Sequence, residues 1–413
     1  MKRSDVKTRA LIVTLSSLFL FSSSPTQAEE PLTLPEVLRI TLSDNPLVSA
    51  WDAKVRAGEG ELVSARAFPN PEIGGTFARI TRFDPRKNEG SVQLSQPFEF
   101  PGKRKYRRQA AEMDLKALAY ERESLKLDLI FEVKSAFYNL LLAKKSSEVA
   151  KDNQRSAQTL LTSAKIRVEV GEAPEFEWIK AQVEAARASN EVQKAASKVS
   201  LAKAALNTLM GRSASSLLEI SGELESAPKE IQLEALLQKA LEGHPLIQQQ
   251  NYLVQKQSRL LDFAKSSRYP DLTVTGFYGR EIDKELVGLG LSLPLPIWYR
   301  QNGAITSAAA EKTRAEAELA RLRNEISRSV TEAYQGYLIS KELVEVFTQQ
   351  LLKQAKESRR IAEISYREGA SGILDLIEAQ RTYRQTFLDY EQALYELKLA
   401  EAALERATGA GSS

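Results

Sequence analysis

Cysteine is absent from the 413 residues of the sequence, and histidine occurs once, as His244. Without cysteine the chain has no disulfides and no thiol to carry a lipid, so core packing or assembly must supply its stability. Any attachment to a membrane must then come from the fold itself. His244 lacks a second histidine or a cysteine with which to form a metal site, so we predict no metal site and no cofactor.

Long apolar runs are also missing after the first thirty residues. No later window contains eighteen or more apolar residues, which argues against a transmembrane helix. If the chain crosses a membrane, it therefore does so in strands.

Excess charge is confined to the start of the chain. The formal net charge is +3, and residues 1–28 carry four Lys/Arg against one acid, which leaves the remainder near neutral. A nucleic-acid partner would ask for a basic face, so we expect none.

The first 28 residues have the pattern of a signal peptide. A basic start is followed by an apolar stretch from Ala10 to Phe21, and Thr26-Gln27-Ala28 is a possible cleavage site. We therefore predict an exported protein that is not lipidated, with its mature start near Glu29.

The remainder of the sequence is an internal duplication with a period near 199 residues. Leu34, Leu42 and Pro46 recur as Leu233, Leu241 and Pro245, and the register holds along the chain at offsets of 197 to 199. We assign residues 29–229 to a first structural repeat and 230–413 to a second.

Each repeat predicts the same elements, in the order helix, two strands, very long helix and shorter helix. The helices expected in the first repeat are 34–67 with a break at Pro46, 103–169 and 174–210. Those expected in the second repeat are 233–265, 304–367 and 373–406. The fold class is therefore mainly α with a small β part.

Helix lengths constrain the shape. A helix of sixty-odd residues rises roughly 100 Å, twice the rise of the shorter helices, so two short helices must stack end to end beside each long one. Residues 174–210 are expected to run halfway back and 233–265 to complete the return. The chain then forms a rod with strands at one end and helix turns at the other.

The strand runs alternate between apolar and small or polar residues. The clearest is Val287–Leu295, in which every second residue is apolar. Such runs fit strands with one face toward lipid and one toward water, although a soluble sheet with one face on a core gives the same pattern. Four strands cannot close in lipid by themselves, so a membrane position requires several copies of the chain.

Aromatic and basic residues flank the strand runs. Trp298 and Tyr299 follow the last strand, where an interfacial aromatic belt would lie. The basic residues 103–108 follow the first strand pair and suit either lipid head groups or a solvated helix start.

With its duplication, strand pairs and long helices, the chain resembles the TolC family of outer-membrane efflux channels over essentially the whole mature sequence. Gln96-Pro97-Phe98-Glu99 and Pro294-Leu295-Pro296, each followed by a basic and glycine-containing turn, are most similar to the CzcC-like heavy-metal branch.

This resemblance implies a homotrimer in the outer membrane of a Gram-negative cell, with a shared β-barrel and a long coiled α-helical barrel that extends into the periplasm. It also implies a periplasmic adaptor protein and an inner-membrane, proton-driven transporter of the RND type as partners. No catalytic constellation is found, so we predict no enzyme and no catalytic residue.

The resemblance also locates candidate functional residues at the turns far from the strands. The docking tips for the adaptor are Val170, Gly171, Glu172, Glu368, Gly369 and Ala370. The entrance gate would contain Asp375 and Glu378 as acidic rings, with Tyr366 bonded to Glu177. In the family a basic residue helps to tie the entrance shut, and Ser371 stands in its place here. Arg367 could take over that role. The simpler interpretation is an ordinary acidic first turn and two turn glycines.

The predicted function is thus a passive exit duct for divalent heavy-metal cations. A duct for drugs, other organic solutes or secreted proteins, and a non-conducting structural rod of the envelope, remain alternatives.

Overall fold

A computed structural model of the chain describes residues 31–79, 88–225, 230–281 and 284–410. The predicted signal peptide and the cleavage site before Glu29 lie outside these residues.

Within the described residues, one order of helices and strands occurs twice. The first set is α1 Leu34–Asp44, α2 Pro46–Arg66, β1 Glu72–Arg79, β2 Asn88–Phe98, α3 Lys103–Glu169 and α4 Glu175–Leu209. The second set is α5 Leu233–Gly243, α6 Pro245–Ser266, β3 Leu272–Glu281, β4 Lys284–Ser292, α7 Asn302–Val346, α8 Leu352–Arg367 and α9 Ile373–Thr408. A π-helical turn, Phe347–Leu351, joins α7 to α8 in one long helix. Every predicted helix is present, and its ends lie within three residues of the expected ones. The boundary between the repeats at 229/230 stays a prediction.

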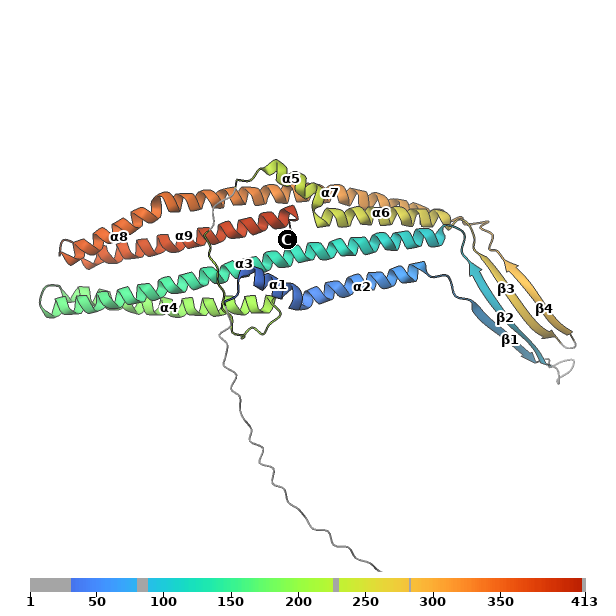
Figure 1. Cartoon of the computed structure of the whole chain (residues 1–413), viewed down its shortest axis with the longest axis horizontal. Coiled ribbons are helices and arrows are strands. Elements are labelled where there is room, and N and C mark those ends of the chain that lie inside the picture. The colour runs from blue at the N-terminus through green and yellow to red at the C-terminus, as the bar shows by residue number, and fades with distance from the viewer. Residues whose placement is uncertain (1–30, 80–87, 226–229, 282–283, 411–413) are drawn as a thin grey trace, which may run out of the picture.

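The molecule is a rod of helices with the strands at one end and the α3–α4 and α8–α9 turns at the other (Figure 1). Helix α3 has 67 residues and α4 has 35, so α3 rises about 100 Å and α4 only about half of that. None of the described helices is long and apolar enough to span a membrane.

The short helices stack end to end inside each repeat, which corrects the predicted pairing. Asn45 Nδ2 donates to the carbonyl of Leu209, at the end of α4, over 2.7 Å. A Cβ on Gly211, which follows α4, would lie 2.6 Å from the carbonyl oxygen of Asp44 at the α1–α2 junction. Helix α4 therefore meets the start of α2. We expected it to meet the 233–265 helix, because chain order predicts the path of the chain but not its contacts.

The second repeat makes the same joint. A Cβ on Gly409, after α9, would lie 2.9 Å from Pro245 Cδ and 3.0 Å from His244 Cα at the α5–α6 junction. His244 Nδ1 accepts the amide of Leu246 over 3.2 Å, which is the N-cap role that Asn45 has in the first repeat. His244 is thus buried as a helix cap, and burial lowers the pKa of its imidazole.

Helices α3 and α4 pack through alanines that recur every seven residues. The buried alanines of α3 include Ala143, Ala150, Ala157 and Ala164, and those of α4 are Ala181, Ala188, Ala195 and Ala202. A seven-residue repeat of small side chains keeps one seam of each helix against its partner and brings the two backbones close. This pair therefore forms a tight coiled coil down to its tip.

The largest core lies at mid-height of the rod, where the two repeats meet. It combines Val133 and Phe137 of α3, Leu206 of α4, and Leu394 and Leu397 of α9. The irregular segment after α4 closes it, because Leu32 pairs with Ile220 as a single parallel bridge. Residues 212–225 therefore lie at mid-height of the rod.

The strands form one antiparallel sheet in the order β1-β2-β3-β4. The predicted last strand, Val287–Leu295, was too long, since β4 ends at Ser292. The apolar alternation continues to Leu295, but Pro294 has no amide hydrogen to donate to a ladder.

Candidate functional site

The sheet has one apolar face and one polar face. The register places Val92, Tyr278 and Val287 side by side, and Leu94 beside Ile73 on the same face. The other face carries Ser95 and Thr275, whose hydroxyls lie 2.9 Å apart in a hydrogen bond.

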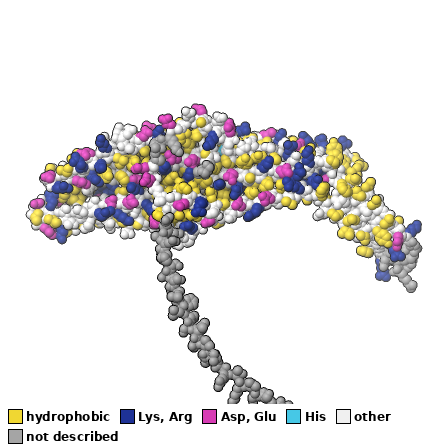
Figure 2. Space-filling model, in the orientation of Figure 1, with side chains coloured by type: hydrophobic (Ala, Val, Ile, Leu, Met, Phe, Trp, Pro, Cys, Tyr) yellow, Lys and Arg dark blue, Asp and Glu magenta, His cyan; other side chains and the backbone are white. Residues whose placement is uncertain are grey.

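The apolar face is largely uncovered within the chain. Phe77 is 87% exposed, and Val287 and Leu289 are each 82% exposed. Figure 2 shows hydrophobic side chains gathered over the sheet. Exposed apolar area on this scale marks a surface that contacts a membrane or another protein.

The two tip turns share one geometry. The amide of Glu172 donates to the carbonyl of Arg167 over 2.8 Å, and the amide of Gly171 to Val168 over 3.1 Å. The second turn repeats this pattern with Ala370 and Gly369 as donors. Gly171 and Gly369 have φ of 79° and 72°, as this helix ending requires. No atom of the described residues would contact a Cβ on either glycine within 4 Å, so both turns are open on this side.

Tyr366 and Glu177 are brought together just inside the tip. The Tyr366 hydroxyl donates to Glu177 Oε2 over 3.3 Å, which links α8 of the second repeat to α4 of the first. Burial raises the pKa of Tyr366, so the hydroxyl keeps the proton that it donates.

The cation beside this pair is Arg167 of α3, where the sequence had suggested Arg367. The Arg167 guanidinium lies 3.9 Å from Glu177 Oε2 and 4.9 Å from the centre of the Tyr366 ring. The sequence did not indicate Arg167, because only the packing of α3 against α4 and α8 brings its guanidinium to this pair.

An ion pair between the two repeats, which the sequence did not indicate, lies further along α4 and α9. Arg381 pairs with Glu184, whose side chain is 9% exposed. Glu184 follows the buried Ala181 by three residues, so the alanine heptads could have placed an acid on the packed seam.

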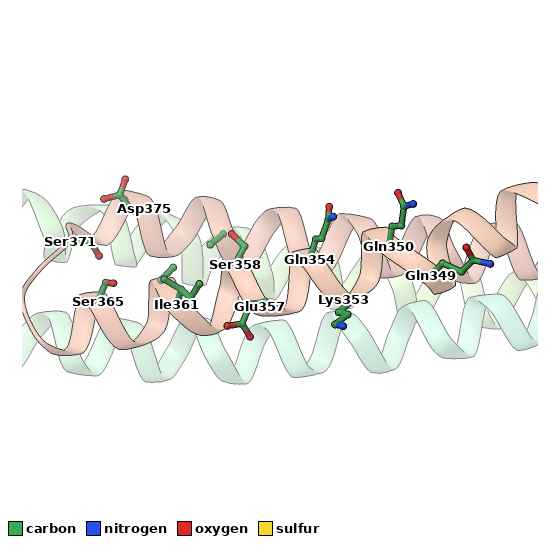
Figure 3. A pocket seen from close by; sticks show the side chains of 12 residues that line it. Gln349, Gln350, Lys353, Gln354, Glu357, Ser358, Ile361, Ser365, Ser371 and Asp375 are labelled. Atoms are coloured by element: carbon green, nitrogen blue, oxygen red, sulfur yellow. The ribbon is translucent and has the colours of Figure 1, made fainter.

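Asp375 and Glu378 are both exposed and lie one turn apart on α9. Asp375 also lines a groove of about 900 Å³ between α8 and α9. Figure 3 shows Asp375 at the tip end of this groove with Ser371 and Ser365, whereas glutamines line the far end. The structure therefore places the two acids on one accessible surface of the tip but joins neither to the Tyr366–Glu177 pair.

Trp298 and Tyr299 follow β4, as predicted, but differ in their surroundings. Trp298 is 93% exposed. The Tyr299 hydroxyl accepts the amide of Ala304 over 3.3 Å and so helps to cap the start of α7.

A rod of paired helices that ends in a four-stranded sheet with an exposed apolar face defines the class of outer-membrane channel proteins. The chain belongs to the outer membrane efflux protein family, whose model matches residues 37–212 and again residues 236–410. It is thus an outer-membrane efflux channel of the TolC family, as the sequence resemblance implied.

Named relatives and solved structures agree with this assignment. The chain is 29% identical over 387 residues to the cobalt-zinc-cadmium resistance protein CzcC of Cupriavidus metallidurans, covering 93% of this chain and 92% of that protein. It is 25% identical over 198 residues to the nickel-cobalt-cadmium resistance protein NccC of Alcaligenes xylosoxydans xylosoxydans, covering 47% and 45%. The fold is similar to a crystal structure of CusC, with a TM-score of 0.79 and 16% sequence identity. The match covers 92% of this chain and 92% of CusC.

Proposed function

We propose that the chain is the passive exit duct of a tripartite efflux pump that exports divalent heavy-metal cations. Three copies would act with a periplasmic adaptor protein and an RND-type transporter of the inner membrane. The observation that carries this proposal is the apolar sheet face, which is continuous over all four strands. Among the described residues, no further strand pairs with the outer edges of β1 and β4.

An open sheet edge exposes unpaired backbone groups, which lipid does not tolerate. Closing β4 of one copy against β1 of the next would satisfy both edges and turn every apolar face outward. A homotrimer would then share one barrel, with the hydroxyls of Ser95 and Thr275 facing its aqueous interior. No lipid anchor is needed for such a subunit, and a signal peptide would deliver it to the periplasm.

The acids at the tip support a cation duct. With three copies, Asp375 and Glu378 would form two acidic rings near the entrance. Rings of carboxylates attract cations and repel anions. The Tyr366–Glu177 bond and Arg167 would hold the entrance closed in each copy.

The two tip turns are the proposed docking surface for the adaptor. Val170 is 62% exposed beside Gly171, and its apolar side chain has no partner in the turn to bury it. Glu172, Glu368, Gly369 and Ala370 complete this surface. At the other end, Trp298 and Tyr299 would lie at the membrane interface.

The cargo is proposed from the relatives. CzcC and NccC are named for resistance to cobalt, zinc, cadmium and nickel, and CzcC aligns along nearly the whole of this chain. A duct need not bind what passes through it, so the cargo assignment does not depend on a metal site.

The test compares metal export from cells that carry one of two single variants. The two substitutions are at neighbouring residues of β2, on opposite faces of the sheet. In a strain that lacks this gene but keeps its transporter and adaptor, we expect the wild-type chain to lower cellular zinc, cobalt and cadmium, measured by mass spectrometry. Leu94→Arg places a charge on the proposed lipid face, which costs about 2–4 kcal/mol at the membrane midplane. Gln93→Arg places the same charge on the polar face.

We expect Gln93→Arg to export and Leu94→Arg to fail at the stage of membrane insertion. Equal insertion and export by both variants would contradict the assignment of the sheet face. The proposed cargo would be wrong if complementation with the wild-type chain changed tolerance to organic compounds but left the cellular contents of zinc, cobalt and cadmium unchanged.

A further inference from the structure

Four segments of the chain form a narrow band where the helices meet the sheet. They are residues 66–72, 99–108, 265–271 and 297–302, each next to the base of one strand. The segments are tied to one another, since Phe100 stacks on Tyr269 at 4.4 Å and Arg268 donates to Asn302 over 3.3 Å.

This junction band is strongly basic, although the net charge of residues 29–413 as a whole is near zero. Its four segments contain nine Lys/Arg and three Asp/Glu. Figure 2 shows Lys and Arg side chains gathered on the helices next to the hydrophobic sheet.

Four of the nine cations stabilise the junction itself. Lys103 Nζ lies 2.7 Å from Asp271 Oδ1, and Arg107 pairs with Glu99 and also donates to the carbonyls at the end of α2. Arg66 and Arg108 share Glu112, each at 3.3 Å.

The other five cations form no ion pair with a carboxylate among the described residues. They are Arg104, Lys105, Lys265, Arg268 and Arg300. The Arg104 guanidinium lies 3.6 Å above the ring of Phe68, which holds its plane while leaving N–H donors free. Arg300 uses Nε on the carbonyl of Pro296 and keeps its terminal N–H groups.

Two of these five cations lie where a nearby anion is favourable. Arg104 and Lys105 lie in the first turn of α3, where positive charge opposes the helix dipole and gains from a nearby anion. The exposed indole of Trp298 lies in the same band, and such side chains favour the head-group level of a bilayer.

We propose that the junction band binds the phosphate groups of anionic phospholipids in the periplasmic leaflet of the outer membrane. This proposal rests on the membrane position of the sheet given under Proposed function. With the apolar face among the acyl chains, the band lies at the depth of the head groups, and guanidinium N–H groups match phosphate oxygens in charge and geometry.

The test measures lipid binding to the purified full-length trimer by native mass spectrometry. Phosphatidylglycerol and phosphatidylcholine of equal chain length are titrated in a neutral detergent. We expect the wild type to prefer phosphatidylglycerol on the order of tenfold, and to lose this preference as salt is added.

The test variant changes the five unpaired cations of the band to glutamine. The control variant changes five exposed cations elsewhere on the rod, also three arginines and two lysines, to glutamine. They are Arg56, Lys151, Arg187, Lys239 and Arg323. We expect the preference to fall to about onefold in the test variant and to persist in the control. If the fivefold variant does not form trimers, Arg104→Gln with Lys105→Gln is used.

Three results would overturn the proposal. They are an unchanged preference in the test variant, an equal loss in the control, and displacement of phosphatidylglycerol by an equal concentration of inorganic phosphate. Insertion and conductance of the same preparations in phosphatidylcholine bilayers test the proposed function separately. A wild type that fails to insert there contradicts the membrane role, whereas intact conductance without lipid preference contradicts only the lipid site.

Discussion

The Tyr366–Glu177 bond at the tip permits a sharp test of the proposed entrance latch. Tyr366→Phe removes the hydroxyl that donates to Glu177 and keeps the ring beside Arg167. A hydrogen bond to a charged group contributes about 1.5–3 kcal/mol. At 3.3 Å, on a carboxylate that is 14% exposed, we assign about 1 kcal/mol per copy.

A loss of about 1 kcal/mol per copy changes the open-to-closed ratio about fivefold, and three copies acting together change it roughly a hundredfold. We therefore expect single trimers with Tyr366→Phe to spend a clearly larger fraction of time in a high-conductance state in planar bilayers. Glu177→Gln is expected to act in the same direction, since it also weakens the attraction of Arg167.

The matched control for the latch is Tyr383→Phe on α9. The Tyr383 ring lies beneath the Arg359 guanidinium at 4.1 Å, and its hydroxyl has no hydrogen-bond partner among the described residues. The substitution thus removes a hydroxyl from the same end of the rod without breaking a latch. Identical open fractions for the two Phe variants would show that the Tyr366 hydroxyl does not hold the entrance closed.

Three further predictions concern the joints and the tip. Gly211→Ala, whose Cβ would lie 2.6 Å from the Asp44 carbonyl oxygen, should lower the free energy of unfolding by about 1–3 kcal/mol more than Gly369→Ala, since Gly369 has a similar φ but open space around it. Thermal unfolding followed by circular dichroism measures this, and equal melting temperatures would contradict the end-to-end joint. Because burial lowers the pKa of His244, the folded state favours the neutral ring and loses stability as pH falls below the unfolded value of about 6.5. His244→Asn introduces the residue that caps the first repeat and should reduce the change in melting temperature between pH 5 and pH 7; an unchanged pH profile would count against this. Asp375→Asn with Glu378→Gln should lower the cation-to-anion permeability ratio, whereas the same charge change at Glu325 and Glu332 of α7 should not. Equal ratios in the two double variants would contradict the proposed acidic rings.

Helices and their lengths could be predicted from the sequence because their signals are local. Apolar spacing, the prolines at 46 and 245, and the glycines that follow α3, α4, α8 and α9 set the ends of these helices to within a few residues. The facing of the strands also follows, because alternation puts Val92 and Leu94 of β2 and Tyr278 of β3 on one side of the sheet. Phe277 departs from this pattern, since it pairs with Gln93 on the polar face.

The contacts between helix ends could not be predicted in the same way. Whether α4 meets α2 or α6 depends on how two repeats fold across each other, and Asn45 and Gly211 show the joint only once the structure brings them together. Arg167 was missed for a related reason, since a cation can reach the Tyr366–Glu177 pair from either repeat. The length of β4 was misjudged because alternation continues through Pro294, where ladder pairing stops.

The proposed function requires that copies of this chain form an open path across a membrane. The most direct test is the conductance of the purified full-length protein, without other subunits, in a planar bilayer. We expect trimers that insert and pass ions in discrete steps, with cations favoured over anions. Trimers that insert but pass no current, also after Tyr366→Phe, would contradict the proposed function and favour a structural rod.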